Sequence, residues 1–293
     1  MHIQFYDQVL TEIQSGNTRD GITLLVGMLD AVSHDQAKFD AASSSLKAHD
    51  LWALLLEDPI CAQANAVPRQ PDLLVDLICE QPARITASST GRRLFDVTAS
   101  LTFARAIRER AKVAEEKLVR AWQAGARICI LGQENLRALR SLAGQDLSNV
   151  TLIEPDALLL NSSEVTFDKS LNRINTSSED FLGARQAPFD LICATTAPDC
   201  LTPLELSDLL ARGRHSLTER GSFQIASFVP GHLGTGWRRA CLGWDIECHS
   251  EANSAAPAGL SARTYRDATD CIVWREFRLT NEDQDKGDTN NGY

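Results

Sequence analysis

The sequence lacks the features that would place the chain in a membrane or outside the cell. No apolar run approaches the roughly 18 residues needed to span a bilayer. The stretch Met1–Asp7 lacks the basic, apolar and small-residue order of a secretory signal. We therefore expect a cytoplasmic protein without a membrane span.

The sequence also lacks the cysteine and histidine patterns of disulfide frameworks and metal sites. None of its eight cysteines forms a Cys-x-x-Cys motif, and most of them stand in apolar segments, which predicts buried free thiols. His215, His232 and His249 are not spaced as metal ligands. We therefore predict no bound metal.

Positive charge is scarce. The chain has 29 lysine and arginine side chains against 39 acidic ones, a formal charge of -10, which disfavours binding to the phosphates of nucleic acid. The one dense basic stretch, Arg105–Lys112, is typical of a solvated helix face.

The first part of the chain, residues 1–124, has helical periodicity and is predicted to form an N-terminal helical subdomain. Apolar residues recur there at steps of three and four. Ser33 and Gln36 have the spacing of a capping box, and a long helix is expected from Phe95 to Ala124, closed by Gly125.

Residues 125–280 change to short apolar runs that alternate with helical segments, the pattern of a doubly wound parallel sheet. Thr202-Pro203-Leu204-Glu205 predicts a capped helix start. Residues 261–265 and 271–278 predict an antiparallel hairpin, which distinguishes a methyltransferase-type Rossmann-like sheet from a dehydrogenase. The polar tail 281–293 is predicted to be disordered. The predicted strands are residues 127–131, 150–153, 171–174, 189–194 and 222–228.

Doubly wound sheets bind ligands at the carboxyl ends of their strands, so the loops there define a candidate site. S-adenosylmethionine (SAM) is the cofactor that these loops suit. Glu154 can accept hydrogen bonds from both ribose hydroxyls, and Gly132 lets the backbone approach the methionine tail. The predicted cofactor-binding residues are Gly132, Glu154, Pro155, Ser177, Ser178 and Thr195.

The first loop departs from the usual pattern of such enzymes. Gln133, Glu134 and Asn135 stand where several glycines are usual, and Glu134 adds negative charge near the expected methionine carboxylate. The alternative is a non-catalytic protein of the same fold, a regulatory subunit or small-molecule binder that is dimeric with an active homologue. Under either hypothesis a homodimer or a heterodimer is an expected state of the chain. An NAD-dependent dehydrogenase is disfavoured because no Gly-x-Gly-x-x-Gly follows the first strand.

Short collinear motifs between residues 50 and 279 resemble bacterial extracellular-factor 3-hydroxypalmitic acid methyl ester biosynthesis proteins, a methyltransferase family. The resemblance implies methyl transfer to a small-molecule or fatty-acid-like carboxylate. Arg69-Gln70-Pro71-Asp72 and Leu131-Gly132 depart from the family pattern. The matching motifs include Glu57-Asp58-Pro59, Pro68-Arg69, Ala104–Arg110, Gly132, Leu136-Arg137, Ser177–Leu182, Phe189-Asp190-Leu191, Asp199, Gly236-Trp237, Tyr265–Thr269 and Ile272-Val273.

A carboxylate acceptor is already ionised near neutral pH and needs no general base, only alignment and a positive anchor. Arg69, Arg105 and Arg108 are candidate anchors, and Trp237 is a further candidate substrate contact. A hydroxyl or amine acceptor would instead require a base. The candidates for that base are Asp199, His232 and Tyr265.

Overall fold

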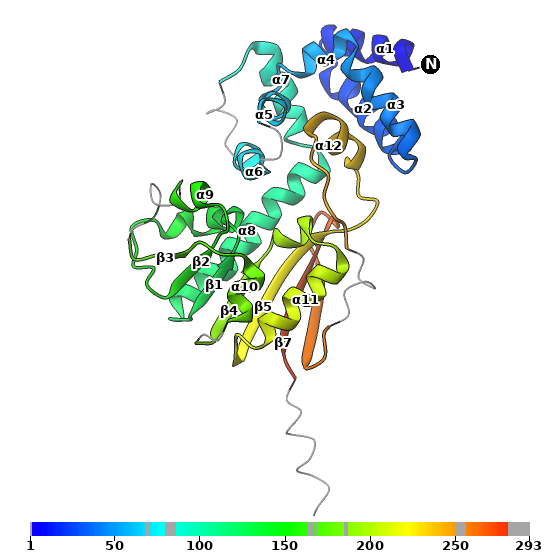
Figure 1. Ribbon diagram of the computed structural model, residues 1–293. Coiled ribbons are helices and arrows are strands. Elements are labelled where there is room, and N and C mark those ends of the chain that lie inside the picture. The colour runs from blue at the N-terminus through cyan, green and yellow to red at the C-terminus, as the bar shows by residue number, and fades with distance from the viewer. Residues whose placement is uncertain are drawn as a thin grey trace, which may run out of the picture. The chain divides into compact units, whose positions relative to one another are not determined.

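A computed structural model describes residues 2–67, 71–79, 86–162, 167, 169–184, 187–249 and 256–280. The chain divides into two compact units (Figure 1). The helical unit is Met1–Glu109 with Gly231–Ile246, and the sheet unit is Arg110–Pro230 with the chain from Glu247 onward. Among the described residues, no helix has both the length and the apolar character that crossing a membrane requires. The predicted tail 281–293 lies outside the described residues.

The boundary between the units differs from the predicted one at residue 124. It falls inside one helix, and a segment that follows the fifth strand joins the helical unit. The reason is a contact between parts remote in sequence. A Cβ atom on Gly236 would lie 2.6 Å from the Asp30 backbone nitrogen, so only glycine permits this approach of α12 to α2. The helices of this unit are α1 (His2–Gln14), α2 (Thr18–Val32), α3 (Gln36–Lys47), α4 (Asp50–Leu55), α5 (Pro59–Ala66), α6 (Pro71–Cys79), α7 (Ser89–Thr98), the start of α8 (Thr102–Gln123) and α12 (Thr235–Leu242).

Two predictions about helices in this unit were wrong. Asp35, not Ser33, caps α3, because its carboxylate accepts a hydrogen bond from the Lys38 backbone N–H. The expected helix over residues 95–124 is two helices, α7 and α8, separated by a turn at Ala99–Leu101. Its predicted end was right, since Gly125 adopts a φ of 71° and its N–H donates to the Trp122 carbonyl.

The sheet unit contains a seven-stranded sheet with the order β3-β2-β1-β4-β5-β7-β6. Strands β1 to β5 are parallel, and β7 runs antiparallel between β5 and β6. This confirms the predicted Rossmann-like fold with a terminal hairpin. The strands are β1 (Ile128–Leu131), β2 (Val150–Ile153), β3 (Asn172–Ile174), β4 (Phe189–Ala194), β5 (Leu217–Phe228), β6 (Leu260–Arg266) and β7 (Ile272–Leu279).

Helices cover both faces of the sheet (Figure 1). The described connections are η2 (Gln133–Leu142), α9 (Ala157–Ser162), α10 (Ser178–Gly183), η4 (Ala197–Cys200) and α11 (Pro203–Arg214), where η denotes a 3₁₀-helix. The predicted cap of α11 is present as a reciprocal capping box between Thr202 and Glu205.

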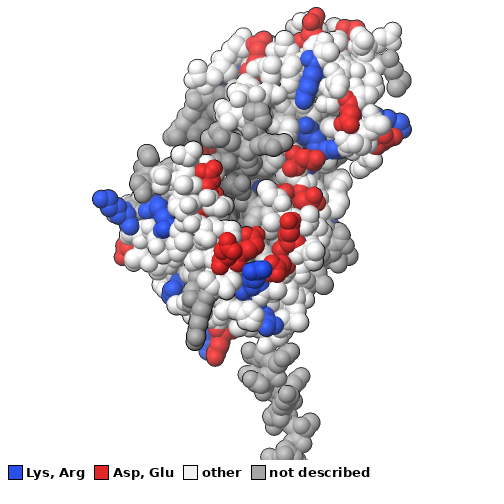
Figure 2. Space-filling model, in the orientation of Figure 1, with Lys and Arg blue, Asp and Glu red and all other residues white. Residues whose placement is uncertain are grey.

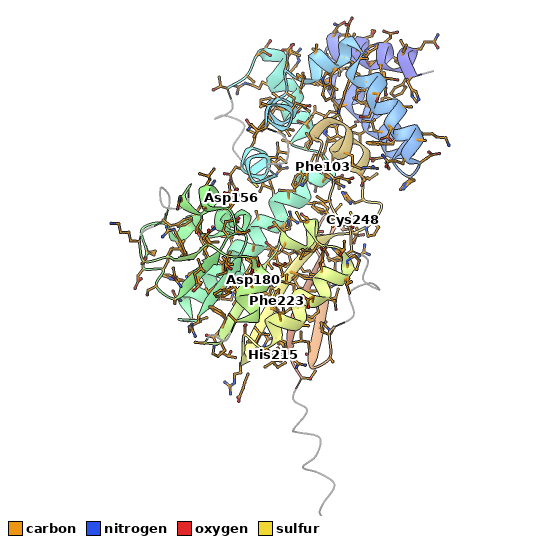
Figure 3. The ribbon with its side chains drawn as sticks, in the orientation of Figure 1. Phe103, Asp156, Asp180, His215, Phe223 and Cys248 are labelled. Atoms are coloured by element: carbon orange, nitrogen blue, oxygen red, sulfur yellow. The ribbon has the colours of Figure 1, made fainter. Side chains whose placement is uncertain are left out.

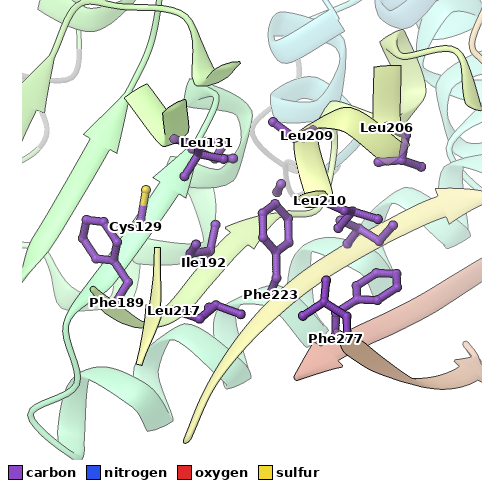
Figure 4. Close-up of a cluster of buried hydrophobic side chains, with 14 of the residues drawn as sticks. Cys129, Leu131, Phe189, Ile192, Leu206, Leu209, Leu210, Leu217, Phe223 and Phe277 are labelled. Carbon is purple, nitrogen blue, oxygen red and sulfur yellow. The ribbon is translucent and has the colours of Figure 1, made fainter. Parts of the chain in front are cut away.

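The core on the α11 face is an apolar cluster (Figure 4). Leu206, Leu209 and Leu210 of α11 pack there on Phe223 of β5 and Phe277 of β7. Fully burying a leucine or phenylalanine stabilises a fold by roughly 1.5 to 3 kcal/mol, so this cluster holds the strand ends in fixed positions. The opposite face is covered by α8, whose Lys117 lies 3.8 Å from the Glu276 carboxylate of β7.

Acidic side chains gather on the surface over α10 and α11 (Figure 2). Glu179 and Asp180 begin α10, and Asp208 of α11 accepts a hydrogen bond from Arg212. This carboxylate raises the pKa of Arg212, with a smaller contribution from Glu179 and Asp180. A face of this charge repels phosphate groups.

Candidate functional site

Strand register brings three of the predicted cofactor residues together. Leu131 of β1 pairs with Ile153 of β2, so Gly132 and Glu154 lie side by side just beyond. Ile130 pairs with Cys193 of β4, which places Thr195 on the other side of Gly132. Ile153 also pairs with Ile174 of β3, so Asn175 lies beside Glu154, on the side away from Gly132. We call Asn175, Glu154, Gly132 and Thr195 the rim row.

The rim row lies where the strand order reverses. From β1 the sheet continues through β2 and β3 on one side and through β4 and β5 on the other. In doubly wound sheets in general, ligands bind at the carboxyl ends of the strands where the order reverses in this way. Asp156, in the loop after β2, lies at this edge, and His215, at the end of α11, lies at the other (Figure 3).

The Glu154 loop is fixed by backbone and side-chain hydrogen bonds. Glu154 is only 7% exposed, and its carboxylate accepts a hydrogen bond of 3.0 Å from the Asp156 N–H. The Asn175 amide donates to the Glu154 carbonyl at 3.0 Å and to the Pro155 carbonyl at 2.8 Å. These hydrogen bonds fix the position of the Glu154 carboxylate at the end of β2.

Sequence reasoning missed Asn175. Its position directly after a predicted strand was a usable signal, because every other member of the rim row was identified from that position. Its function as a clamp depends on carbonyl groups 20 and 21 residues away, which no local pattern indicates.

Gly132 has φ 85° and ψ 137°, a conformation that favours glycine strongly. Its N–H donates to the Ile153 carbonyl at 2.9 Å, which ties the start of the first loop to β2. The segment that follows is the 3₁₀-helix η2 and not an α-helix. A residue with a Cβ atom would be strained in this conformation. Because glycine has no Cβ atom, a ligand can approach the backbone closely here.

The two serines after β3 lie at the start of α10. Ser177 is the N-cap of that helix, and its hydroxyl accepts a hydrogen bond of 3.0 Å from the Asp180 N–H. Ser178 occupies the first turn. The structure thus gives Ser177 a capping function, and contact of either serine with an adenine ring stays a prediction.

Asp199, a candidate base, is engaged in a buried ion pair. Its carboxylate lies 2.8 Å from the Arg110 guanidinium, and the two side chains are 4% and 3% exposed. The ion pair fixes where the Asp199 carboxylate lies, and its use as a general base stays a prediction.

The remaining candidates are not in the rim row. His232, Trp237, Arg105 and Arg108 belong to the helical unit. Tyr265 lies on β6, the edge strand, where its ring stacks on that of Trp274. Arg69 lies outside the described residues.

Trp237 and Arg108 have structural surroundings. Trp237 is fully buried in α12, and its contact with substrate stays a prediction. Arg108 donates to the Ile78 carbonyl at 3.2 Å, and partial burial lowers its pKa. Arg105, by contrast, is exposed.

All eight cysteines are free, as predicted, and burial raises the pKa of the Cys193 thiol on β4 to about 12. At neutral pH this thiol is protonated and a weak nucleophile. The described residues contain no group of three or more histidine, cysteine or acidic side chains arranged to hold a metal ion.

Comparison with known proteins gives a likeness in fold. No protein-family model and no curated protein matches the sequence, so the resemblance to methyl ester biosynthesis proteins stays a prediction. A crystal structure titled as a possible exported protein from Bordetella parapertussis is similar with a TM-score of 0.53 and 16% identity, over 74% of this chain and 85% of that one. At this identity the likeness extends to the fold alone.

Two further solved structures are more weakly similar. A DUF574 family protein from Streptomyces avermitilis has a TM-score of 0.49 and 12% identity, over 72% of this chain and 97% of that one. The CcbJ methyltransferase from Streptomyces caelestis has a TM-score of 0.43 and 15% identity, over 59% and 89%. Both scores are too low for either structure to inform the function of this chain.

Proposed function

We propose that this chain is a SAM-dependent methyltransferase that acts on a small-molecule or lipidic acceptor. The observation that carries the proposal is the rim row: a buried acid, a glycine with positive φ and a threonine lie side by side where the strand order reverses. The antiparallel β7 between β5 and β6 supports a methyltransferase in preference to a dinucleotide-dependent dehydrogenase.

The residues of the rim row fit the groups of a sulfonium nucleoside. The Glu154 carboxylate would accept hydrogen bonds from the ribose diol, and Gly132 would let the methionine tail approach the backbone. Thr195 would lie beneath the sulfonium, and Ser177 and Ser178 beside the adenine. SAM, when bound, supplies an electrophilic methyl group. The protein's own contribution is orientation and the exclusion of water.

For the acceptor, we propose a carboxylate, with methyl ester formation as the reaction. A carboxylate arrives ionised, so the reaction does not depend on a general base. Asp199, the candidate base nearest the rim row in sequence, is held by Arg110, which is compatible with such an acceptor. Arginine anchoring of the acceptor and a dimeric state are parts of the proposal that remain predictions, as does a cytoplasmic location.

Calorimetry with SAM and with S-adenosylhomocysteine (SAH) tests the proposal. We expect SAH to bind with a dissociation constant in the range of about 1 to 100 μM, and no heat from either ligand at about 1 mM would contradict a SAM site. A scintillation assay with methyl-labelled SAM and a panel of fatty acids then tests the acceptor class.

Glu154→Gln is expected to weaken SAH binding about tenfold, because the amide keeps one acceptor but loses the charge that strengthens both ribose hydrogen bonds. The matched control is Asp156→Asn, which removes a charge from the same loop. Asp156 is exposed and caps α9 through the Leu158 N–H at 2.8 Å, a function that asparagine retains. Equal affinity of Glu154→Gln and the wild type would remove Glu154 from the ribose site.

A non-catalytic binder is the second candidate function. It is favoured by the first loop, where η2 replaces an α-helix whose N-terminal amides would hold the methionine carboxylate. SAH binding without methyl transfer to any acceptor tested would favour this candidate over the enzyme.

A further inference from the structure

Arg110 and Asp199 form a buried ion pair at the loop that follows β4. The guanidinium Nη1 of Arg110, on α8, lies 2.8 Å from Oδ2 of Asp199, in η4. Both side chains are almost fully buried. Arg110 was expected to be solvated with the rest of the Arg105–Lys112 stretch, and its burial corrects that prediction.

Contacts around the ion pair join the carboxyl ends of β4 and β5. The Arg110 guanidinium lies over the Phe228 ring, 5.2 Å from its centroid, at the last residue of β5. The Asp199 N–H donates to the Thr196 carbonyl at 3.0 Å. The Asp199 carbonyl in turn accepts a hydrogen bond of 2.8 Å from the Glu247 N–H.

His249 holds the same loop from a second direction. Its backbone N–H donates to the Phe228 carbonyl at 2.9 Å, and its Nε2 lies 2.8 Å from the Pro198 carbonyl. The loop from Thr195 to Asp199 is thereby held by α8 on one side and by residues 247–249 on the other. Its first residue, Thr195, belongs to the rim row.

Stability alone is a poor explanation for this ion pair. Removing two charges from water costs several kcal/mol each, and apolar side chains of similar volume often stabilise a fold as well or better. What an ion pair adds is direction, because the guanidinium and carboxylate planes accept only certain relative positions. A loop that must hold Thr195 at one position in the rim row benefits from that constraint.

We infer that Arg110 is a positioning residue for the proposed methyl-transfer site: through Asp199 it fixes the loop after β4 at the rim row, where the methionine and sulfonium of the cofactor would bind. The inference rests on the proposed function and extends it to a residue that contacts neither cofactor nor acceptor. It gives Asp199 a structural part in the site in place of proton transfer.

The test replaces the ion pair by apolar residues of similar size, Arg110→Met with Asp199→Leu. The matched control is Lys117→Met with Glu276→Leu, since Lys117 is on the same helix, pairs with a half-buried acid of β7 and lies over the Trp274 ring, but away from the rim row. We expect both double variants to fold, and only the first to weaken SAH binding, by about tenfold.

Hydrogen exchange separates this inference from the proposed function. Without the ion pair, amides of residues 195–201 should exchange at least about tenfold faster, while those of β1 and β4 stay protected. Unchanged exchange in the double variant would overturn the inference, whether or not the protein binds SAH. A wild-type protein that binds no SAH would instead overturn the proposed function. Faster exchange with unchanged SAH affinity would make the pair structural only, which also overturns the inference.

Arg110→Lys provides a second variant if the double variant does not fold. It keeps the charge and loses the planar geometry, so we expect SAH binding to weaken about threefold or more with the melting temperature nearly unchanged. If Arg110→Lys bound SAH as tightly as the wild type, a positive charge without the planar guanidinium geometry would be sufficient. That result would contradict the inference.

Discussion

Gly236→Ala is expected to destabilise the helical unit by about 3 kcal/mol, because a methyl group there has no space and the surrounding backbone cannot move aside without shifting a whole helix. The added Cβ would collide with the Leu29 carbonyl and lie 2.6 Å from the Asp30 nitrogen, all of them backbone atoms of α2. A flexible side chain could rotate away, but a helix backbone must shift as a whole. Urea denaturation followed by tryptophan fluorescence measures the effect.

The same substitution would also disturb hydrogen bonds at the start of α12. The Asp30 carboxylate accepts from the Gly234 N–H and the Gly236 N–H, each at 2.7 Å, and so satisfies two amides that a helix N-terminus leaves without partners. Moving α12 away from α2 would lengthen both. Bonds of this charged kind contribute roughly 1.5 to 3 kcal/mol, so the total loss should exceed that from the steric clash alone.

Gly27→Ala is the matched control for Gly236→Ala. Gly27 lies inside α2, and a Cβ atom there would meet nothing within 4 Å. Alanine should therefore stabilise the helix by roughly 0.5 to 1 kcal/mol through its better helix propensity. Opposite signs at the two glycines are the expected result, and destabilisation of similar size at both would contradict the packing explanation.

Local signals in the sequence were enough for most of the sheet unit. The capping box at Thr202 and Glu205 depends on residues three positions apart, and the apolar runs of β1, β2 and β4 specify strands buried on both faces. Because parallel strands end at one edge, the identity of three rim residues also followed from these runs. The glycine at 132 and the acid at 154 needed no knowledge of long-range contacts.

The errors came where a residue's function is set by a remote partner. Gly236 and Trp237 form part of α12, whose packing on α2 depends on Asp30, 206 residues earlier than Gly236. Arg110 was placed among solvated arginines although it continues the buried stripe of Phe103, Ile107 and Ala114 at steps of three and four. A charged residue on an apolar stripe was the signal that should have separated Arg110 from its neighbours.

Asp58 should make the helical unit less stable as the pH rises from about 4 to about 6. It caps α5 by accepting from the Ile60 N–H at 3.2 Å, yet it is fully buried. Burial raises its pKa from 3.8 to about 6, although the hydrogen bond from the Ile60 N–H acts in the opposite direction. Between these values the folded chain keeps a proton that the unfolded chain releases, so folding is favoured at low pH and loses stability as the carboxyl ionises.

The size of this effect follows from the pKa difference, which corresponds to about 3 kcal/mol in the free energy of unfolding. Asp58→Asn should remove the dependence, because the amide keeps the cap and never ionises, and it should be more stable than the wild type at pH 7. Urea denaturation from pH 4 to pH 8 measures both. The free energy of unfolding of the wild type also depends on the titration of every other group. The quantity to follow with pH is therefore the difference in this free energy between Asp58→Asn and the wild type.

Asp35→Asn is the control, because Asp35 caps α3 in the same unit from an exposed position. Hydrogen bonds from Lys38 lower the pKa of Asp35, so its contribution to stability has the opposite sign and is lost as the pH falls. If Asp58→Asn and the wild type keep the same difference in stability at every pH, the Asp58 carboxyl titrates alike in the folded and unfolded chains, and burial does not govern its ionisation.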